Sequence, residues 1–373
     1  MMSKANLLKV HRWVGLCLSL LLLVQGLTGT ILVFRDEIDR LIHAELIVDT
    51  PSGMARLPVQ SLVDKVRAEV PGATLQRIEF PGRPDGALIF IMRDQAREPY
   101  IVAVDPYRGT ILRQGGYGAW PTELVFRIHD GLLSGDVGDM IIGCEGVGLA
   151  FIIIVGFASW WPGRRRLRQG FRVIRGQGTD RTVRTFHRAL GGAAAAILLM
   201  SATTGALMIF RADLQPMLAM TKRPAPKVAE RPGHARLPAD TLIERATATH
   251  GPMEIDQIRF SGKELQVVAL YFKDEGAWRA NATRQFFVNA YDGREMGRYD
   301  PRDLPAVNTA FDWMFTIHTG RAAWMPGRLL VLAGGLSLIF FTISGVWLWS
   351  SRTRARKAKV AARKAAASLV PQD

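Results

Sequence analysis

The chain has few cysteines for its length. Only Cys17 and Cys144 occur among 373 residues, which excludes a disulfide-rich secreted scaffold. Cys17 lies in the first half of one long apolar run and Cys144 near the start of the next. Because successive membrane helices run in opposite directions, these positions fall at different depths and a disulfide between them is not expected. We interpret both as small packing residues.

Long apolar runs are what the sequence does contain. Four of them, Trp13 to Phe34, Met140 to Trp161, Ala189 to Phe210 and Leu329 to Trp349, are almost free of charge. At about 1.5 Å per residue each spans roughly 30 Å, the thickness of the hydrocarbon core of a bilayer. The first run is longer than a typical signal-peptide core and lacks a small-x-small cleavage site, so we expect an uncleaved helix. The sequence predicts four transmembrane helices.

Positive charge is concentrated at the ends of these runs. The net charge is +15, and residues 1–12, 162–188 and 350–373 hold 19 of the 48 Lys and Arg with only Asp180 and Asp373 acidic. This segregation is the positive-inside pattern, which places both termini and the 162–188 loop in the cytoplasm. The excess charge is therefore not a nucleic-acid surface. The cytoplasmic parts are too short for a flavin domain, and no glycine-rich dinucleotide fingerprint follows a strand.

About a hundred residues of mixed polarity separate runs one and two, and again runs three and four. In each, a Leu-Pro pair (Leu57-Pro58, Leu237-Pro238) precedes a helical pattern, and alternating strands follow. The expected strands are 74–80, 87–93 and 100–104, and then 254–260, 265–272 and 285–290, each set closed by a turn and, in the first lobe, a last short strand. We predict two small α+β lobes that pack on each other.

The membrane elements repeat along the chain. His11-Arg12, Thr28-Gly29 and Phe34-Arg35 recur 176 positions later as His187-Arg188, Thr204-Gly205 and Phe210-Arg211. A second element repeats at an offset of 189, where Phe126, His129, Gly131, Gly146, Gly156 and Trp160 match Phe315, His318, Gly320, Gly335, Gly345 and Trp349. Four of the seven histidines thus form two equivalent pairs, His11 with His187 and His129 with His318.

Two histidine pairs in a helical bundle favour axial ligation of haem iron. Two neutral imidazoles fill both axial positions, which suits electron transfer rather than oxygen activation. Interfacial histidines that bond lipid or a loop are the alternative interpretation. Arg12 and Arg188 are candidates for haem propionates, although snorkelling to lipid phosphates explains the same positions.

Other polar residues have weaker patterns. His43 has no counterpart in the second copy and could substitute as an axial ligand, whereas His234 and His250 are expected to be solvated in the second lobe. Glu145 is the one carboxylate inside an apolar run, which makes it a candidate for proton transfer or for a structural hydrogen bond.

The ordered motifs resemble the PepSY-associated transmembrane-helix family, the iron-regulated inner-membrane proteins of bacteria. The resemblance rests on the His-Arg-Trp and Thr-Gly helix, the Val-Asp-Pro-Tyr-x-Gly turn and the Phe-x-Ile-His-x-Gly element, and within the family it is strongest to the siderophore reductases. It implies two b-type haems and reduction of a ferric siderophore on the periplasmic face.

The fold class expected is therefore a four-helix membrane bundle with an internal two-fold repeat and two periplasmic PepSY-like lobes. The predicted segments are a cytoplasmic N-terminus (1–12), the first span (13–34), lobe one (35–120), a periplasmic segment bearing His129 (121–139), the second span (140–161), a basic cytoplasmic loop (162–188), the third span (189–210), lobe two (211–305), a periplasmic segment bearing His318 (306–328), the fourth span (329–349) and a basic cytoplasmic tail (350–373).

The expected function is reduction of ferric siderophore by an inner-membrane di-haem protein. Electrons would enter at the haem of His11 and His187 from a separate donor, a quinol or a cytoplasmic reductase, and leave from that of His129 and His318. The expected partners are thus the ferric siderophore, the donor and membrane lipids, but not nucleic acid. Candidate aromatic contacts to the iron complex at the lobe interface are Tyr107, Trp120, Trp313 and Trp324. The rival hypothesis is a non-enzymatic membrane-anchored module that binds or regulates a periplasmic protein or protease.

Overall fold

The computed structural model describes residues 3–50, 54–229, 231, 233–261, 266–273 and 283–368. They divide into two compact units, each drawn from several stretches of the chain. One unit, residues 1–33, 126–210 and 317–373, holds the apolar helices and is called the bundle. The other, residues 34–125 and 211–316, holds the strands and is called the lobe unit.

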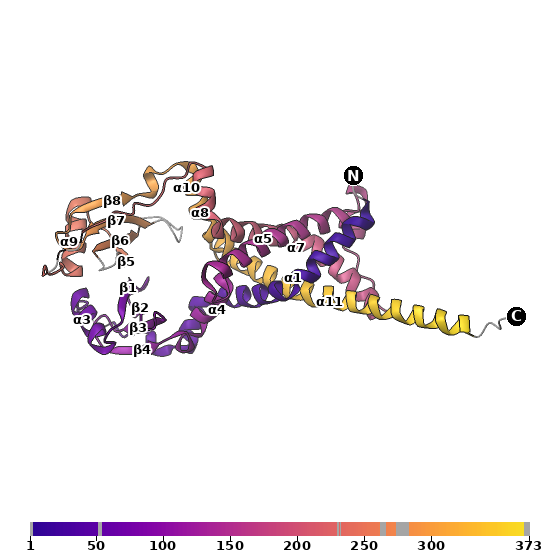
Figure 1. Cartoon of the computed structure of the whole chain (residues 1–373), viewed down its shortest axis with the longest axis horizontal. Helices are drawn as coiled ribbons and strands as arrows, with labels where there is room; N and C mark the ends of the chain where they lie inside the picture. Colours follow the sequence, from indigo (N-terminus) through magenta and orange to yellow (C-terminus); the bar gives the residue numbers. More distant parts are fainter. Residues whose placement is uncertain are drawn as a thin grey trace. The chain divides into compact units, whose positions relative to one another are not determined.

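Four long helices form the bundle (Figure 1). They are α1 (Lys4–Leu32), α5 (Gly135–Trp160), α7 (Thr179–Ile209) and α11 (Trp324–Ser368). Each has a stretch long and apolar enough to cross a membrane. Helix α5 packs on α1 and α7, and α11 packs on the same two helices, so the four make a closed ring. The four predicted spans are confirmed as helices.

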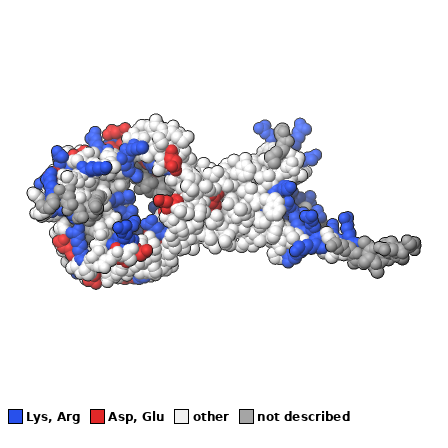
Figure 2. Space-filling view, in the orientation of Figure 1, with Lys and Arg blue, Asp and Glu red and all other residues white. Residues whose placement is uncertain are grey.

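The helices are longer than the apolar runs that predicted them. Helix α1 begins at Lys4, α7 at Thr179 and α11 continues to Ser368, so parts of the predicted basic loop and tail are helical. Basic side chains are tolerated there because they lie beyond the ends of the apolar stretches and can reach water. Figure 2 shows Lys and Arg gathered where α1 begins and α5 ends and along the last part of α11, while the middle of the bundle lacks them.

Glycine allows the bundle helices to approach closely. A Cβ on Gly146 would lie 3.1 Å from the Cβ of Ala206 on α7, and one on Gly335 would meet Thr30 of α1. An apolar layer, formed by Leu22, Ile152, Leu198 and Leu338 with Ala194, fills the centre. Van der Waals packing between small residues is what holds helices together where lipid removes the hydrophobic driving force.

The lobe unit is built on one antiparallel sheet. Its eight strands lie in the order β4-β3-β2-β1-β5-β6-β7-β8. The first lobe supplies β1 (Thr74–Glu79), β2 (Leu88–Arg93), β3 (Pro99–Val104) and β4 (Ile111–Gly115), and the second supplies β5 (Ile255–Ser261), β6 (Val267–Lys273), β7 (Thr283–Asn289) and β8 (Glu295–Tyr299). The predicted strands are present, except that Leu265 lies outside the described residues.

The two lobes share this sheet rather than packing as separate bodies. Strand β1 pairs with β5 through Arg77, Ile78 and Glu79 opposite Arg259, Ile258 and Gln257. The sequence predicts two lobes that pack on each other but does not indicate that they do so through paired strands.

Two helices cover one face of the sheet. Helices α3 (Val59–Glu69) and α9 (Ala239–His250) bury Leu62, Val66 and Leu242 against Ile78 and Ile258. Their first turns cap each other. The Asp240 carboxylate accepts hydrogen bonds from the backbone N–H of Val59 and Gln60, at 2.8 Å each, and the side-chain Oε1 of Gln60 accepts one from the backbone N–H of Ala239 at 3.0 Å. Both helices thus satisfy N–H groups that would otherwise be unpaired.

Short helices link the sheet to the long ones. They are α2 (Arg35–Ile42), η1 (Ala44–Leu46), η2 (Tyr117–Ala119), α4 (Pro121–Gly131), α8 (Arg211–Met217), η4 (Pro301–Asp303), α10 (Ala306–His318) and η5 (Arg321–Ala323), with η3 (Arg164–Arg166) and α6 (Leu167–Gly170) between α5 and α7. Helices α4 and α10 carry His129 and His318, as the repeat predicts for short helices outside the spans.

Candidate functional site

His11 and His187 lie face to edge inside the bundle. Their ring centroids are 6.5 Å apart and their planes are at 89°. His11 is on α1 and His187 on α7, both two turns inside their helices and directly before the apolar runs. We call these two residues the inner pair.

His129 and His318 form a second pair, here called the outer pair. Their ring centroids are 6.2 Å apart with planes at 54°. His129 lies two residues before the end of α4, and His318 is the last residue of α10. Burial and the neighbouring imidazole lower the pKa of His129 to about 3, and burial lowers the pKa of His318 as well. Both rings are therefore neutral, the form that ligates a metal.

Hydrogen bonds fix which ring nitrogen of each inner histidine carries the proton. The Nδ1 of His11 lies 2.9 Å from the carbonyl oxygen of Ile152, and a carbonyl can only accept. The Nδ1 of His187 lies 2.7 Å from the Ser344 hydroxyl. Ser344 donates its own proton to the carbonyl of Phe341 at 3.3 Å, so it accepts from His187. Both Nδ1 atoms therefore carry hydrogen.

The outer histidines have the same tautomer. The Nδ1 of His129 lies 2.9 Å from the Thr28 hydroxyl. Thr28 donates to the carbonyl of Val24 at 2.7 Å, which leaves its lone pairs to accept from His129. Threonine is the acceptor here because its side chain is satisfied within its own helix and still has a free lone pair.

His318 is held in the same way with one bond more. Its Nδ1 lies 3.0 Å from the Thr204 hydroxyl and 3.1 Å from the carbonyl oxygen of Ser201. Thr204 donates to the carbonyl of Met200 at 2.8 Å. Since a carbonyl and a committed hydroxyl both accept, the His318 Nδ1 carries hydrogen.

All four histidines thus point an unprotonated Nε2 away from the helix that holds Nδ1. Within the described residues, no hydrogen bond reaches any of these Nε2 atoms. Two imidazoles that share one metal ion, each with nitrogen about 2 Å from it, have centroids about 6 Å apart. Both pairs match that spacing.

The chemistry of the donors fits haem better than a free ion. No group of three or more His, Cys, Asp or Glu side chains that could hold a metal occurs among the described residues. A bare ion would be left with two protein ligands, whereas haem brings four ring nitrogens of its own. The groups that would hold it are His11 with His187 and His129 with His318.

Each imidazole also lies beside a glycine of a neighbouring helix. A Cβ built on that glycine would come close to the ring, which leaves little room for any larger residue at three of the four positions. The distances from such a Cβ to Cε1 are 2.9 Å for Gly156 and His11, 3.0 Å for Gly29 and His129, 3.3 Å for Gly205 and His318, and 4.0 Å for Gly345 and His187.

Tight turns tie the helices of the outer histidines to the spans that follow. A Cβ on Gly138, in the first turn of α5, would lie 1.7 Å from the carbonyl oxygen of Gly131 at the end of α4. The turn from α10 to α11 has the same form, because a Cβ on Gly327 would lie 2.2 Å from the oxygen of Gly320. Only glycine permits these backbone contacts.

Ion pairs fasten the other end of the same helices. Arg35, in the first turn of α2, binds Glu123 of α4 at 2.7 Å, and Arg211, at the start of α8, binds Asp312 of α10 at 3.0 Å. These two arginines directly follow the predicted spans, and each forms an ion pair with a carboxylate. The arginine positions follow the repeat, and so do the acids, which are 189 positions apart.

The two arginines proposed for haem propionates have different surroundings. Arg188 is exposed and donates to the carbonyls of Gln169 and Arg172 at 3.2 and 3.0 Å, so it fastens the loop before α7. Arg12 has a buried Nε without a hydrogen-bond partner. Propionate binding stays a prediction for both.

The remaining histidines lie in the lobe unit, outside both pairs. His43 is 3 % exposed and packs on Trp120 with ring centroids 5.8 Å apart. His250 stacks on Phe286 and its Nε2 is 2.6 Å from Glu295, so it is not the solvated residue that was expected.

Two of the four aromatic side chains expected to contact the substrate are core residues. Tyr107 and Trp120 are 8 % and 7 % exposed and belong to an apolar cluster with Ile101 and Ala103. A contact role at the surface is therefore wrong for these two. Trp324 is 74 % exposed, and Trp313 lies on α10.

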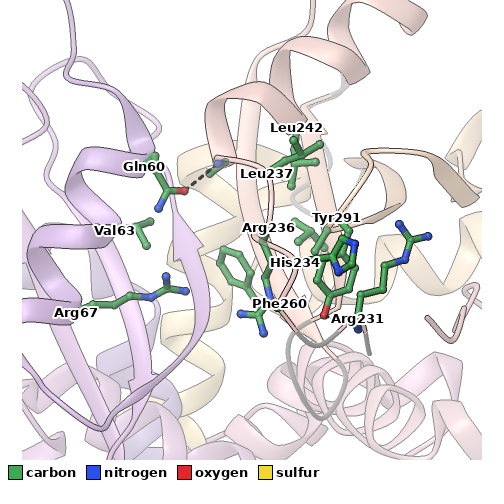
Figure 3. Close-up of a pocket in the computed structure, with 14 residues that line it drawn as sticks. Gln60, Val63, Arg67, Arg231, His234, Arg236, Leu237, Leu242, Phe260 and Tyr291 are labelled. Atoms are coloured by element: carbon green, nitrogen blue, oxygen red, sulfur yellow. Dashed lines mark hydrogen bonds between the residues drawn. The ribbon is translucent and has the colours of Figure 1, made fainter. Parts of the chain in front are cut away.

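The lobe unit contains a pocket of about 390 Å³ beside α3 and α9. In Figure 3, Arg67 and Gln60 project from the first lobe, opposite Arg231, His234, Arg236 and Tyr291 of the second. Its lining also includes the apolar side chains Val63, Leu242 and Val268, and the side chain of Gln60 meets the start of α9. His234, expected to be solvated, is exposed in the wall of this pocket.

Comparison with known families gives one match. The family model described as the PepSY-associated TM region matches residues 8–352, which is nearly the whole chain. No curated protein matches.

Proposed function

This chain belongs to the family of proteins with a PepSY-associated transmembrane region, and we propose that it is a di-haem electron-transfer protein of the bacterial inner membrane that reduces ferric siderophore. The observation that carries the proposal is the common tautomer of the four membrane histidines. In each pair, two Nε2 atoms are unprotonated and free, at the spacing of two axial ligands.

If His11 with His187 and His129 with His318 each hold a haem, the group would supply one-electron transfer, and the two imidazoles would leave no position for oxygen. The chain's own residues orient the rings: an acceptor on Nδ1 raises the basicity of Nε2 and prevents the ring from turning. The glycines beside the rings let the imidazoles of His11, His129 and His318 pack closely against the neighbouring helix, where a larger side chain would displace them.

The two pairs are separated along the bundle. His129 lies against Gly29 of α1, and His11 is 18 positions earlier on the same helix, which corresponds to about 27 Å along its axis. The apolar layer of Leu22, Ile152 and Leu198 lies between them and excludes water. This spacing supports one site near each face of a membrane.

The distribution of charge supports the orientation that we propose. The termini and the 162–188 segment carry most of the unbalanced positive charge, so they would lie in the cytoplasm and the two lobes in the periplasm. An electron would then enter at the inner pair and leave from the outer pair. Because the sequence lacks a nucleotide fingerprint, a quinol or a separate cytoplasmic reductase would supply it.

Reduction would release iron from its chelator. Siderophores hold ferric iron through hard oxygen donors, and ferrous iron, with less charge, binds such donors more weakly. One electron per iron suffices, and the chelator is not broken.

The visible spectrum of the purified detergent-solubilised protein, oxidised and then reduced, tests the proposal together with pyridine haemochrome quantification. We expect a low-spin b-type spectrum, two haems per chain, and reoxidation of the reduced protein on addition of a ferric siderophore. A protein expressed with ample haem that shows no Soret band would leave the rival reading, a non-enzymatic module that binds a periplasmic protein through its lobes. If the protein holds haem but the ferric siderophore does not reoxidise it, the proposed substrate is wrong and the proposal of haem binding stands.

A further inference from the structure

Glu145 is a carboxyl buried inside a membrane-spanning helix without a partner. It lies in the middle of α5 and is 3 % exposed. Neither Oε1 nor Oε2 has a hydrogen-bond partner. Burial of an ionised carboxylate without a partner costs several kcal/mol, so such a group is retained for a function or remains protonated.

The position of Glu145 on α5 directs it toward the histidine sites. Ile152, whose carbonyl holds His11, and Gly156, which lies beside the His11 ring, follow at spacings of 7 and 11 residues. These spacings place all three on one face of a helix.

Its depth in the bundle is that of the outer pair. The next residue, Gly146, contacts Ala202 and Ala206 of α7. Between these two alanines lies Thr204, whose hydroxyl holds His318. Glu145 therefore lies on a buried face of α5, closer in depth to the outer pair than to the inner pair.

No cation of the surrounding spans can balance its charge. Helices α1 and α7 pack against α5; residues 13–34 of α1 carry one titratable side chain, Cys17, and residues 189–210 of α7 carry none. Residues 329–351 of α11 carry none either. On α5 itself the other titratable groups are Asp136, Asp139 and Cys144. The helices of the outer pair and the start of α11 contribute further groups, which are Glu123, Arg127, His129 and Asp130 on α4, Asp312 and His318 on α10, and Arg328 on α11.

We propose that Glu145 binds a proton when the iron held by His129 and His318 is reduced, and releases it when that iron is oxidised. This inference rests on the proposed function. Ferric iron with two neutral imidazoles and the doubly negative macrocycle leaves one net positive charge, which an adjacent carboxylate balances. After one electron arrives, that charge is lost, and the carboxylate takes one proton from water to become a neutral carboxylic acid. Electron and proton enter together, so the low-dielectric interior gains no net charge.

The test is the pH dependence of the haem midpoint potentials in the purified holoprotein. For the outer haem, isolated in a His11→Ala background, we expect a slope that approaches about 59 mV for each tenfold change in proton concentration, the value for one proton per electron. Glu145→Gln keeps the shape of the side chain and should abolish the slope. Asp136→Asn, which removes an exposed acid from the first turn of the same helix, should retain it.

A slope that survives Glu145→Gln, or a wild-type outer potential that does not change with pH, would overturn the inference and leave the di-haem proposal intact. A protein without haem overturns both. If the Glu145→Gln protein fails to assemble, the redox-difference infrared spectrum of the wild type decides: a carboxylic acid band that appears on reduction is expected, and its absence contradicts the proposal.

Discussion

The inner and outer histidine pairs consist of the same residue type, but different groups accept the hydrogen bonds from their Nδ1 atoms. Thr28 and Thr204 accept from the outer rings and occupy equivalent positions in the two copies. The inner rings are held by a carbonyl of α5 and a serine of α11, at positions that the repeat does not relate. The outer site is therefore specified twice by one dipeptide, Thr-Gly, whereas the inner site has two independent supports.

The pairs also differ in how their helices are anchored. The inner histidines are part of long helices that cross the bundle, and the outer ones end short helices that are held by glycine turns and ion pairs. Substitutions of residues that contact neither imidazole can therefore displace the histidines of the outer pair. The inner site depends mainly on helix packing.

Removal of a ligand should have the largest effect. His129→Ala or His318→Ala is expected to halve the haem content, because the outer haem loses an axial nitrogen while the inner pair is intact. His11→Ala or His187→Ala should also halve it and leave the outer haem. Haemochrome quantification per polypeptide measures the loss, and four variants with full haem content would refute the pairing.

Glycine substitutions should affect the two histidines of the inner pair differently. Gly156→Ala places a Cβ 2.9 Å from the His11 ring, but Gly345→Ala places one 4.0 Å from His187. We expect Gly156→Ala to weaken haem retention by about tenfold, the effect of a displaced ligand, and Gly345→Ala to resemble wild type. Gly191→Ala, whose Cβ would be 4.0 Å from Phe341, is the matched control. Equal loss in both glycine variants would mean that the rings do not rest on these glycines.

Loss of a hydroxyl acceptor should affect the two histidines of the outer pair differently. Thr28→Val leaves the His129 Nδ1 without its acceptor and should weaken the outer haem by roughly 10- to 100-fold and raise its potential. Thr204→Val should do less, because the carbonyl of Ser201 still accepts from His318 at 3.1 Å. Haem dissociation and redox titration measure both effects. An equal response to the two valines would contradict the role of Ser201.

The ion pairs should have the smallest effect on the haems, since Glu123 and Asp312 contact neither imidazole pair. Glu123→Gln should destabilise the outer site by about 1 kcal/mol, because the Arg35 side chain of this pair is still 31 % exposed to solvent. Asp312→Asn should cost more, because Asp312 is 2 % exposed and its loss strands Arg211. Thermal loss of the outer haem band, with the inner band as internal reference, measures the difference. If the inner band is lost first in these variants, the ion pairs do not support the outer helices.

Much of the membrane unit could be predicted because its signals are local and repeated. Apolar length predicted the spans, and the recurrence of His11 as His187 and of His129 as His318 predicted the residues that the structure brings together. The Thr-Gly repeat also contained the outer acceptors and the glycines beside the rings, which sequence reasoning left unassigned. The threonine of each Thr-Gly pair was the available signal. A threonine hydroxyl inside a helix donates to a carbonyl of its own helix and can then accept a hydrogen bond from a side chain of a neighbouring helix.

Other features depend on tertiary placement and had no sequence signal. Ile152 acts through its backbone carbonyl, which any residue provides, and Ser344 has Val155 at the equivalent position. Arg188 contacts loop carbonyls because the loop folds back on α7. The β1–β5 pairing joins strands from different copies, and local alternation of polarity predicts each strand but not its neighbour.

That pairing has a consequence for the order in which the protein is made. Once the first lobe has been synthesised, the edge of β1 has no partner until residues 255–261 emerge after two further membrane helices. The unpaired N–H and C=O groups of an open strand edge can form hydrogen bonds with a strand of another chain. The nascent protein therefore carries an unpaired strand edge while residues 80–254, nearly half of the chain, are added. A chain that stops after α7 would keep this edge.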